Sequence, residues 1–167
     1  RVIRLAKRSG FCVAANTGIA AASGGVVELL NDDTEVTAGW AEAALRWFAD
    51  PRVAAVAPLV LLNDPDRTAR GLAPLIDSAG DVFLRSGGAF KRLHGARSAD
   101  ANESLEVFGV CGAACLMPRR VFDELGGFDE AFFASHEDVD LSYRARLRGY
   151  RVRYVAELVA IAPDGSQ

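Results

Sequence analysis

The sequence predicts an α/β fold in which a mixed sheet is flanked by helices, and three observations support this. Helical and strand-like patterns alternate along most of the 167 residues. Two strand-like runs, residues 26–30 and 53–60, are almost continuously apolar, as in strands that are buried on both faces. Half of the residues are hydrophobic and a quarter are charged, and the length suits one domain with a sizeable core.

The first elements follow in order. Residues 2–5 resemble the middle of a strand, so we expect upstream strands of the fold to be missing from this chain. Residues 11–22 are small and apolar and predict a helix, which Gly24 and Gly25 end. The strand at residues 26–30 comes next.

A second helix is predicted over residues 39–49, with Thr37 as its cap. The prediction depends on four residues that recur at helical spacing, namely Trp40, Ala44, Trp47 and Phe48. The strand at residues 53–60 follows. Residues 61–104 hold scattered Gly and Pro and predict a long loop region with short strands, a kind of segment that is often functional.

The last third of the chain predicts five shorter elements. They are strands at residues 106–108 and 114–117, helices at 118–125 and 139–148, and a strand at 151–155. The mixture of hairpin-like and helix-linked strands indicates mixed strand directions.

Composition excludes some classes of function. The formal net charge is −3, so no basic field favours nucleic acid as a partner. No run approaches the roughly 18 apolar residues of a membrane span. The three cysteines form no regular framework, which favours buried thiols in a reducing compartment.

Two acidic clusters about a hundred residues apart carry the predicted chemistry. Asn31-Asp32-Asp33-Thr34-Glu35 follows a strand, and ligands of open α/β sheets bind outside the carboxyl ends of strands. A Mg²⁺ or Mn²⁺ ion that serves a diphosphate needs only one or two protein carboxylates. Glu137-Asp138-Val139-Asp140 opens a helix, and crowded carboxylates raise one another's pKa, which suits a general base.

Each cluster also has a structural interpretation. Asn and Asp are common in turns because their side chains bond nearby backbone groups. Ser135 is three residues before Asp138, close to a capping box, and acids suit a helix start. The small residues 109–114 can form a tight connection or allow a ligand to approach the backbone closely.

Six motifs occur in an order that resembles family 2 glycosyltransferases, which have the GT-A fold, and most closely a bacterial rhamnosyltransferase-like branch. They are Gly10-Phe11-Cys12-Val13-Ala14-Ala15-Asn16-Thr17-Gly18, Leu30-Asn31-Asp32-Asp33-Thr34-Glu35, Ile76-Asp77-Ser78-Ala79-Gly80, Phe108-Gly109-Val110-Cys111-Gly112-Ala113-Ala114, Gly126-Gly127-Phe128-Asp129-Glu130-Ala131-Phe132-Phe133 and Glu137-Asp138-Val139-Asp140-Leu141. The resemblance implies that residues 1–167 are part of a catalytic domain that transfers a sugar from a nucleotide-diphosphate donor with inversion.

The resemblance also implies roles for residues. Asp33 would hold a divalent cation, Mg²⁺ or Mn²⁺, with Asn31 and Asp32 around it at the donor diphosphate. Asp138 would be the general base, with Glu137 beside it.

Two further residues, Gly112 and Asn16, receive donor-site roles. Gly112 would lie near the donor sugar, and Asn16 would border the nucleotide pocket. At the C-terminal end, residues 162–166 stand where family members often carry an aromatic-His pair before Gly-Ser, so a histidine that could ligate the metal is missing there.

The implied partners are a dTDP-, UDP- or GDP-sugar and a glycan or lipid-linked acceptor. The implied setting is the assembly of cell-surface or secreted polysaccharide in the cytoplasm, with peripheral association at the inner face of the membrane. Two other functions stay open on the sequence. One is a non-catalytic or degenerate domain that binds sugar nucleotides or glycans. The other is a two-metal phosphohydrolase, which would want more ligands, often histidines.

Overall fold

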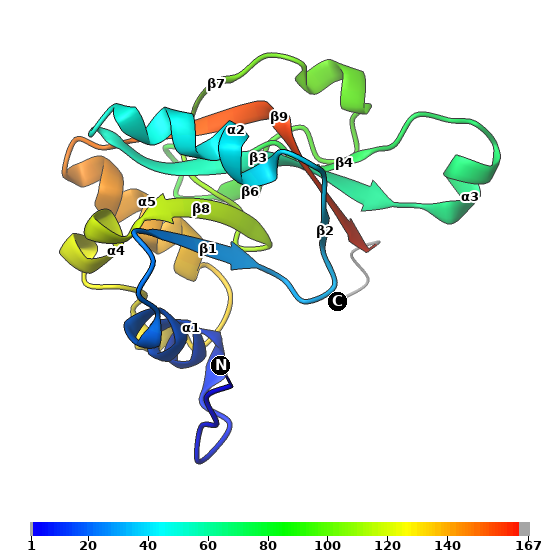
Figure 1. Ribbon diagram of the computed structural model, residues 1–167. Coiled ribbons are helices and arrows are strands. Elements are labelled where there is room, and N and C mark those ends of the chain that lie inside the picture. The colour runs from blue at the N-terminus through cyan, green and yellow to red at the C-terminus, as the bar shows by residue number, and fades with distance from the viewer. Residues whose placement is uncertain (1, 164–167) are drawn as a thin grey trace.

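The structure is a computed structural model that describes residues 2–163, and its centre is a seven-stranded mixed sheet (Figure 1). Five strands follow one another across the sheet in the order β1 (Val26–Leu30), β8 (Ala114–Pro118), β3 (Val53–Asn63), β9 (Arg151–Pro163) and β2 (Glu35–Val36). β4 (Ile76–Ser78) also pairs with β3, and β7 (Leu105–Val107) pairs with β9. Strands β3 and β9 run parallel and the other described pairs are antiparallel, which confirms the predicted mixed directions.

Helices cover both faces of the sheet (Figure 1). Three helices contribute to one core cluster, α1 (Gly10–Ala21), α4 (Arg119–Leu125) and α5 (Glu137–Leu147). The other cluster holds α2 (Trp40–Leu45), with the 3₁₀ helix η1 (Arg46–Ala49) packed against it. A sheet between two helical layers buries apolar side chains on both faces, and Val53 to Val60 are accordingly all buried.

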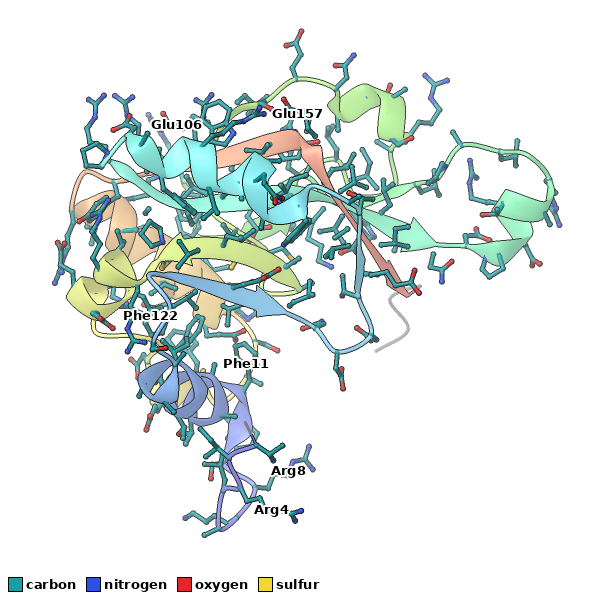
Figure 2. All side chains as sticks on the ribbon, in the orientation of Figure 1. Arg4, Arg8, Phe11, Glu106, Phe122 and Glu157 are labelled. Atoms are coloured by element: carbon teal, nitrogen blue, oxygen red, sulfur yellow. The ribbon has the colours of Figure 1, made fainter. Side chains whose placement is uncertain are left out.

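Aromatic rings fix the position of α1 against the rest of the chain. Figure 2 shows Phe11 on α1 and Phe122 on α4 in the same part of the molecule. Between them lies Phe128, whose ring meets Phe11 edge-on at 5.6 Å and Phe122 at 5.4 Å between centroids. Such edge-to-face pairs stabilise the packing beyond what the burial of apolar area contributes. The segment after α4 therefore anchors α1.

Two predictions at the level of single elements are wrong. Residues 2–5 form no strand, because within the described residues no neighbouring strand supplies backbone partners, and Val2 is 85% exposed. Thr37 does not cap α2. Its hydroxyl donates to the carbonyl of Val159 at 3.2 Å, and Gly39, with φ of +78°, is the residue before the helix.

The middle of the chain is more regular than predicted. It contains α3 (Pro65–Ala69), β4, a hairpin of β5 (Asp81–Phe83) and β6 (Ala89–Lys91), and the 3₁₀ helix η2 (Ser98–Ala101). A third 3₁₀ helix, η3 (Glu130–Phe132), precedes α5. Residues 162–166 stand where the aromatic-His pair and Gly-Ser were expected. Of these, residues 164–166 lie outside the described part of the chain.

Candidate active site

The second acidic cluster occupies the first turn of α5. His136, with φ of +69°, is the residue before the helix, and its own side chain makes no capping hydrogen bond. Ser135 also has a positive φ, +73°, and makes no capping bond, so the capping box considered above is absent. Asp140 pairs with Arg144, whose Nη2 lies 2.7 Å from Asp140 Oδ2. Of the three acids, Asp140 is therefore the one that serves helix structure.

Backbone N–H groups orient the carboxylate of Asp138. Gly112 donates to Oδ2 at 2.7 Å, and Val139 donates to Oδ1 at 2.8 Å. Bonds to an ionised acceptor are among the stronger hydrogen bonds in proteins. The side chain is thus held in one orientation at the wall of a cavity, as a proton-accepting group requires.

The loop of residues 109–113 approaches α5 closely at both of its glycines. A Cβ on Gly109 would lie 2.6 Å from Ser142 Oγ, and a Cβ on Gly112 would lie 3.3 Å from Asp138 Oδ2. The amide of Val110 also donates to Ser142 Oγ at 3.3 Å. The small residues of this loop therefore accommodate α5.

The same loop contacts the first acidic cluster. Strand β1 pairs with β8 in a register that sets Leu30 opposite Ala114. Just beyond this pair, the amide of Asn31 donates to the carbonyl of Ala113 at 3.0 Å. The two acidic clusters, distant in sequence, thus lie on either side of one five-residue loop.

Asn31, Asp32 and Asp33 are exposed at the turn after β1. The turn is closed by backbone groups, because Thr34 N–H donates to the carbonyl of Asn31 at 3.1 Å. The side chains of these three residues make no hydrogen bond within residues 2–163, so turn formation does not use their oxygens.

These free oxygens fit a hard divalent cation. Carboxylate and amide oxygens are the donors that Mg²⁺ and Mn²⁺ prefer. Across the described residues, no group of three or more His, Cys, Asp or Glu side chains is arranged to hold a metal. The arrangement suits an ion whose remaining ligands come from water and a bound diphosphate.

A cavity of about 170 Å³ lies beside Asp138. Its polar lining comes from four segments, and the residues are Asp81, Lys91, Cys111, Ser135, His136 and Asp138. Burial raises the pKa of the Cys111 thiol to about 12, so this group stays protonated and is no nucleophile. The carboxyl groups are the reactive candidates.

Asp81 is buried in this cavity wall. It is 6% exposed, and its Oδ1 has no hydrogen-bond partner. Burial, with a smaller contribution from the charge of Asp138, raises the pKa of Asp81 to about 7. Nearby, Lys91 Nζ contacts both carboxylate oxygens of Asp77, at 2.9 and 2.8 Å.

Glu137 is buried next to Asp138 and does not line the cavity. It is 8% exposed, its Oε2 has no partner, and burial raises its pKa above the ordinary range. Its Oε1 lies 3.5 Å from the position of a Cβ on Gly112. Glu137 and Asp138 therefore both lie close to Gly112.

Asn16 lies on α1, apart from the cavity. Its Nδ2 donates to the carbonyl of Phe128 at 2.9 Å and to Glu130 Oε1 at 3.3 Å, and its Oδ1 accepts from the amide of Phe128 at 3.0 Å. These bonds tie α1 to the segment before η3. The predicted place of Asn16 beside a nucleotide stays a prediction.

Asp81 and Lys91 are not among the residues predicted from the sequence. Residues 76–80 form one of the family motifs but received no predicted role. A signal was available, since Asp77 and Asp81 stand in a run of small and apolar residues where solvated acids are uncommon. His136, to which no role was assigned from the sequence, is exposed at the start of α5 and also lines the cavity.

The fold is shared with solved GT-A glycosyltransferases. GalNAc-T7, solved with UDP, GalNAc and Mn²⁺, matches 98% of this chain and 32% of its own with a TM-score of 0.74 and 19% identity. The mannosyltransferase PcManGT from Pyrobaculum calidifontis, solved with GDP-Man and Mn²⁺, matches 96% of this chain and 38% of its own with a TM-score of 0.62 and 20% identity. These likenesses confirm the predicted GT-A architecture.

The sequence gives the family. Residues 1–126 match the family described as Glycosyl transferase family 2, and the chain belongs to this family. The pre-mycofactocin glycosyltransferase of Mycobacterium tuberculosis is 35% identical over 147 residues, or 87% of this chain. The N-acetylglucosaminyl-diphospho-decaprenol L-rhamnosyltransferase of the same organism is 36% identical over 123 residues, or 68% of this chain. The chain spans 28% and 38% of the lengths of these two relatives. The predicted resemblance to family 2 is thereby confirmed.

Proposed function

We propose that this chain forms part of the catalytic site of an inverting glycosyltransferase that uses a nucleotide-diphosphate sugar and an acceptor hydroxyl. The single observation that carries the proposal is the loop of residues 109–113. Gly112 N–H donates to Asp138, and the carbonyl of the next residue, Ala113, accepts from Asn31 N–H. A single displacement at a sugar carbon needs a base and a diphosphate-binding group at fixed positions, and both bond to this short loop.

Asp138 acts as the general base. It accepts the proton of the acceptor hydroxyl while that oxygen attacks the anomeric carbon of the donor sugar. The bond from this carbon to the diphosphate breaks at the same time on the opposite face, and the nucleoside diphosphate leaves with the electron pair. A positioned base contributes about 10²–10⁴-fold to such a reaction.

Asp33, Asn31 and Asp32 bind the diphosphate end of the donor. Their exposed oxygens make no hydrogen bonds within residues 2–163, so they can bind a Mg²⁺ or Mn²⁺ ion that accompanies the nucleotide. When bound, the cation neutralises negative charge that builds on the leaving diphosphate. Gly112 leaves room for the donor sugar, because no side chain projects from it toward Asp138.

The relatives suggest the partners. The name of one M. tuberculosis relative describes rhamnosyl transfer to a diphospho-decaprenol-linked sugar, and we infer a glycan or lipid-linked acceptor here as well. Such an acceptor would bring the full protein to the inner face of the membrane by peripheral contact. Among residues 2–163 no helix is both long and apolar enough to cross a bilayer. Co-sedimentation of the full-length protein with vesicles of anionic and neutral lipids tests the peripheral contact.

The decisive experiment compares the full-length protein with its Asp138→Asn variant. Sugar transfer is measured from dTDP-, UDP- and GDP-sugars with Mn²⁺, and nucleotide binding is measured by calorimetry. We expect the variant to lose transfer by about 10²-fold or more and to keep its nucleotide affinity. Asp123→Asn, an exposed carboxylate on α4, is the matched control and should leave both unchanged.

Two results would overturn the proposal. Equal loss of binding and transfer in Asp138→Asn contradicts the assignment of the base. Nucleotide binding without turnover in the wild-type protein favours the non-catalytic domain instead. The configuration of the product at its anomeric carbon, read by NMR, separates inversion from retention.

A further inference from the structure

We propose that Asp81 binds a second hydroxyl group of the acceptor, next to the hydroxyl that Asp138 deprotonates, so that the site selects sugar-like acceptors with several hydroxyls. The inference rests on the proposed function, because it concerns the acceptor of the same reaction. It names the chemistry of that acceptor from a residue that no sequence motif assigned.

The first support is the unsatisfied carboxyl group of Asp81. Asp81 is only 6% exposed, and its Oδ1 lacks a hydrogen-bond partner. The residue lines the cavity together with Asp138. A buried polar group without a hydrogen bond is costly, so such groups in native proteins call for an explanation. Since Oδ1 is itself enclosed, a ligand hydroxyl in the cavity would reach the carboxyl group through Oδ2, to which no described residue donates.

The second support is the way the backbone holds Asp81. Its N–H donates to the carbonyl of Gly109 at 2.9 Å, and its carbonyl accepts from Phe108 N–H at 3.1 Å. The loop of residues 109–113 therefore fixes Asp81 at its first glycine and Asp138 at Gly112. Two carboxyl groups whose residues bond to one loop can bind two hydroxyls of one sugar ring.

The third support is the charge around Asp81. Lys91 is the cation of the cavity wall, but both oxygens of Asp77 already contact its ammonium group. The other titratable groups of the cavity are Asp138, His136 and Cys111. Because burial raises the pKa of Asp81 to about 7, both of its protonation states are present near neutrality. A hydroxyl can donate to the ionised form and accept from the neutral form, which a cationic or anionic partner cannot do.

The fourth support is an aromatic groove that shares His136 and Val139 with this cavity. Phe83, Phe132 and Tyr143 also line it, and the ring of Phe83 stacks on Phe108 at 4.8 Å. The groove has a volume of about 260 Å³. Ligand sites combine apolar and aromatic walls with a few placed polar groups, and this pair of hollows has that composition.

The test is a cycle that removes one hydroxyl from the ligand and one carboxyl from the protein. The full-length protein, saturated with Mn²⁺ and the nucleoside diphosphate that it binds best, is titrated by ligand-observed NMR. The probes are octyl glycosides of glucose, galactose, mannose, rhamnose and N-acetylglucosamine. The monodeoxy analogues of the tightest probe follow, against wild type and Asp81→Ala.

We expect Asp81→Ala to weaken the parent glycoside by about tenfold or more. One monodeoxy analogue should bind the wild type equally weakly and lose nothing further in the variant, which is the signature of a direct pair. Asp81→Asn keeps the shape of the side chain and one oxygen. Its affinity for the parent glycoside should lie between those of the wild type and Asp81→Ala. Asp66→Asn, an exposed carboxylate on α3, is the control and should not change binding.

Three results overturn the inference. Asp81→Ala weakens the binding of the parent glycoside and of every monodeoxy analogue equally, or it weakens none of them, or the nucleotide-loaded wild type binds no glycoside. Thermal unfolding and nucleotide titration of each variant show that the fold and donor site persist. Failure of the proposed function is distinct, since it appears as absent nucleotide binding or as transfer that survives Asp138→Asn.

Discussion

Gly112 donates its backbone N–H to Asp138 Oδ2 at 2.7 Å, across 26 residues of sequence. The bond joins the loop of residues 109–113 to the first turn of α5 at the carboxylate proposed as the base. It also explains why position 112 is glycine, since a Cβ there would lie 3.3 Å from the same oxygen. The orientation of Asp138 therefore depends on the absence of a side chain at position 112.

Gly112→Ala tests this requirement. A methyl group must displace Asp138 by a few tenths of an ångström, and misplacement of a reacting group lowers catalysis more than it lowers stability. We expect transfer to fall about 10-fold or more, with a change in the free energy of unfolding of less than about 1 kcal/mol. Steady-state kinetics and urea unfolding on the full-length protein provide both numbers.

Gly109→Ala is the matched comparison on the same loop. A Cβ there would overlap Ser142, at 2.6 Å from Oγ and 2.7 Å from Cβ, and both residues are buried. Overpacking of this kind costs about 1–3 kcal/mol, so this variant should lose stability first. Equal stability losses in the two variants would show that Gly112 is merely a packing position.

The acidic turn after β1 predicts a metal that binds with the nucleotide. Thermal unfolding is measured with UDP, dTDP and GDP, each with and without Mn²⁺. A ligand at 100 times its dissociation constant stabilises the folded state by about 2.7 kcal/mol. We expect this shift to need both nucleotide and metal, and to disappear in Asp33→Asn, because few protein oxygens are available to hold the ion alone.

Glu35→Gln is the control for that turn, since Glu35 is exposed on the neighbouring β2. It should keep the shift produced by nucleotide and Mn²⁺ together. A shift with Mn²⁺ alone in the wild type, or one that survives Asp33→Asn, would remove Asp33 from the metal site.

Much of the fold could be predicted because local patterns and tertiary contacts agree there. The strand at residues 26–30 coincides with β1, and the apolar run 53–60 forms most of β3. The prediction for β9 stopped at Val155, whereas the strand continues to Pro163. That extension depends on pairing with β3 from Val159 onward, a contact between distant segments that has no local signature.

The site was predicted in part for the same reason. Acids at a strand end and at a helix start are visible in the sequence, and the structure brings both to the loop of residues 109–113. Asp81 could not be found in this way. Its burial arises only when the β5–β6 hairpin packs so that Asp81 bonds Gly109, which short-range periodicity does not encode.

Asn16 gives a prediction that separates two roles. Its amide makes three hydrogen bonds to Phe128 and Glu130, so Asn16→Ala should lower the free energy of unfolding by about 1–3 kcal/mol. We expect nucleotide affinity, measured by calorimetry well below the unfolding temperature, to stay unchanged. A weaker nucleotide affinity in a folded variant would instead support the place beside the nucleotide that the family resemblance implies. Asn102→Ala, on an exposed residue after η2, is the control.

The buried carboxyl of Asp81 predicts how stability depends on pH. Its pKa rises from an ordinary 3.8 to about 7 on folding, chiefly through burial. Between these values the unfolded chain has released the proton that the folded chain still holds, so rising pH favours unfolding through this group. Each pKa unit corresponds to about 1.4 kcal/mol, and the penalty is complete above about pH 7.

Asp81→Asn removes that penalty. We expect the variant to exceed the wild type in free energy of unfolding by up to roughly 4 kcal/mol at pH 8, and this excess to shrink steadily toward pH 4. Urea unfolding at half-unit pH steps measures the difference, with Asp66→Asn as the exposed control. A difference that stays constant from pH 4 to pH 8 would mean that Asp81 ionises normally in the folded protein. An ionised Asp81 would still accept a hydrogen bond from a hydroxyl, so the acceptor contact itself is tested by the glycoside titrations.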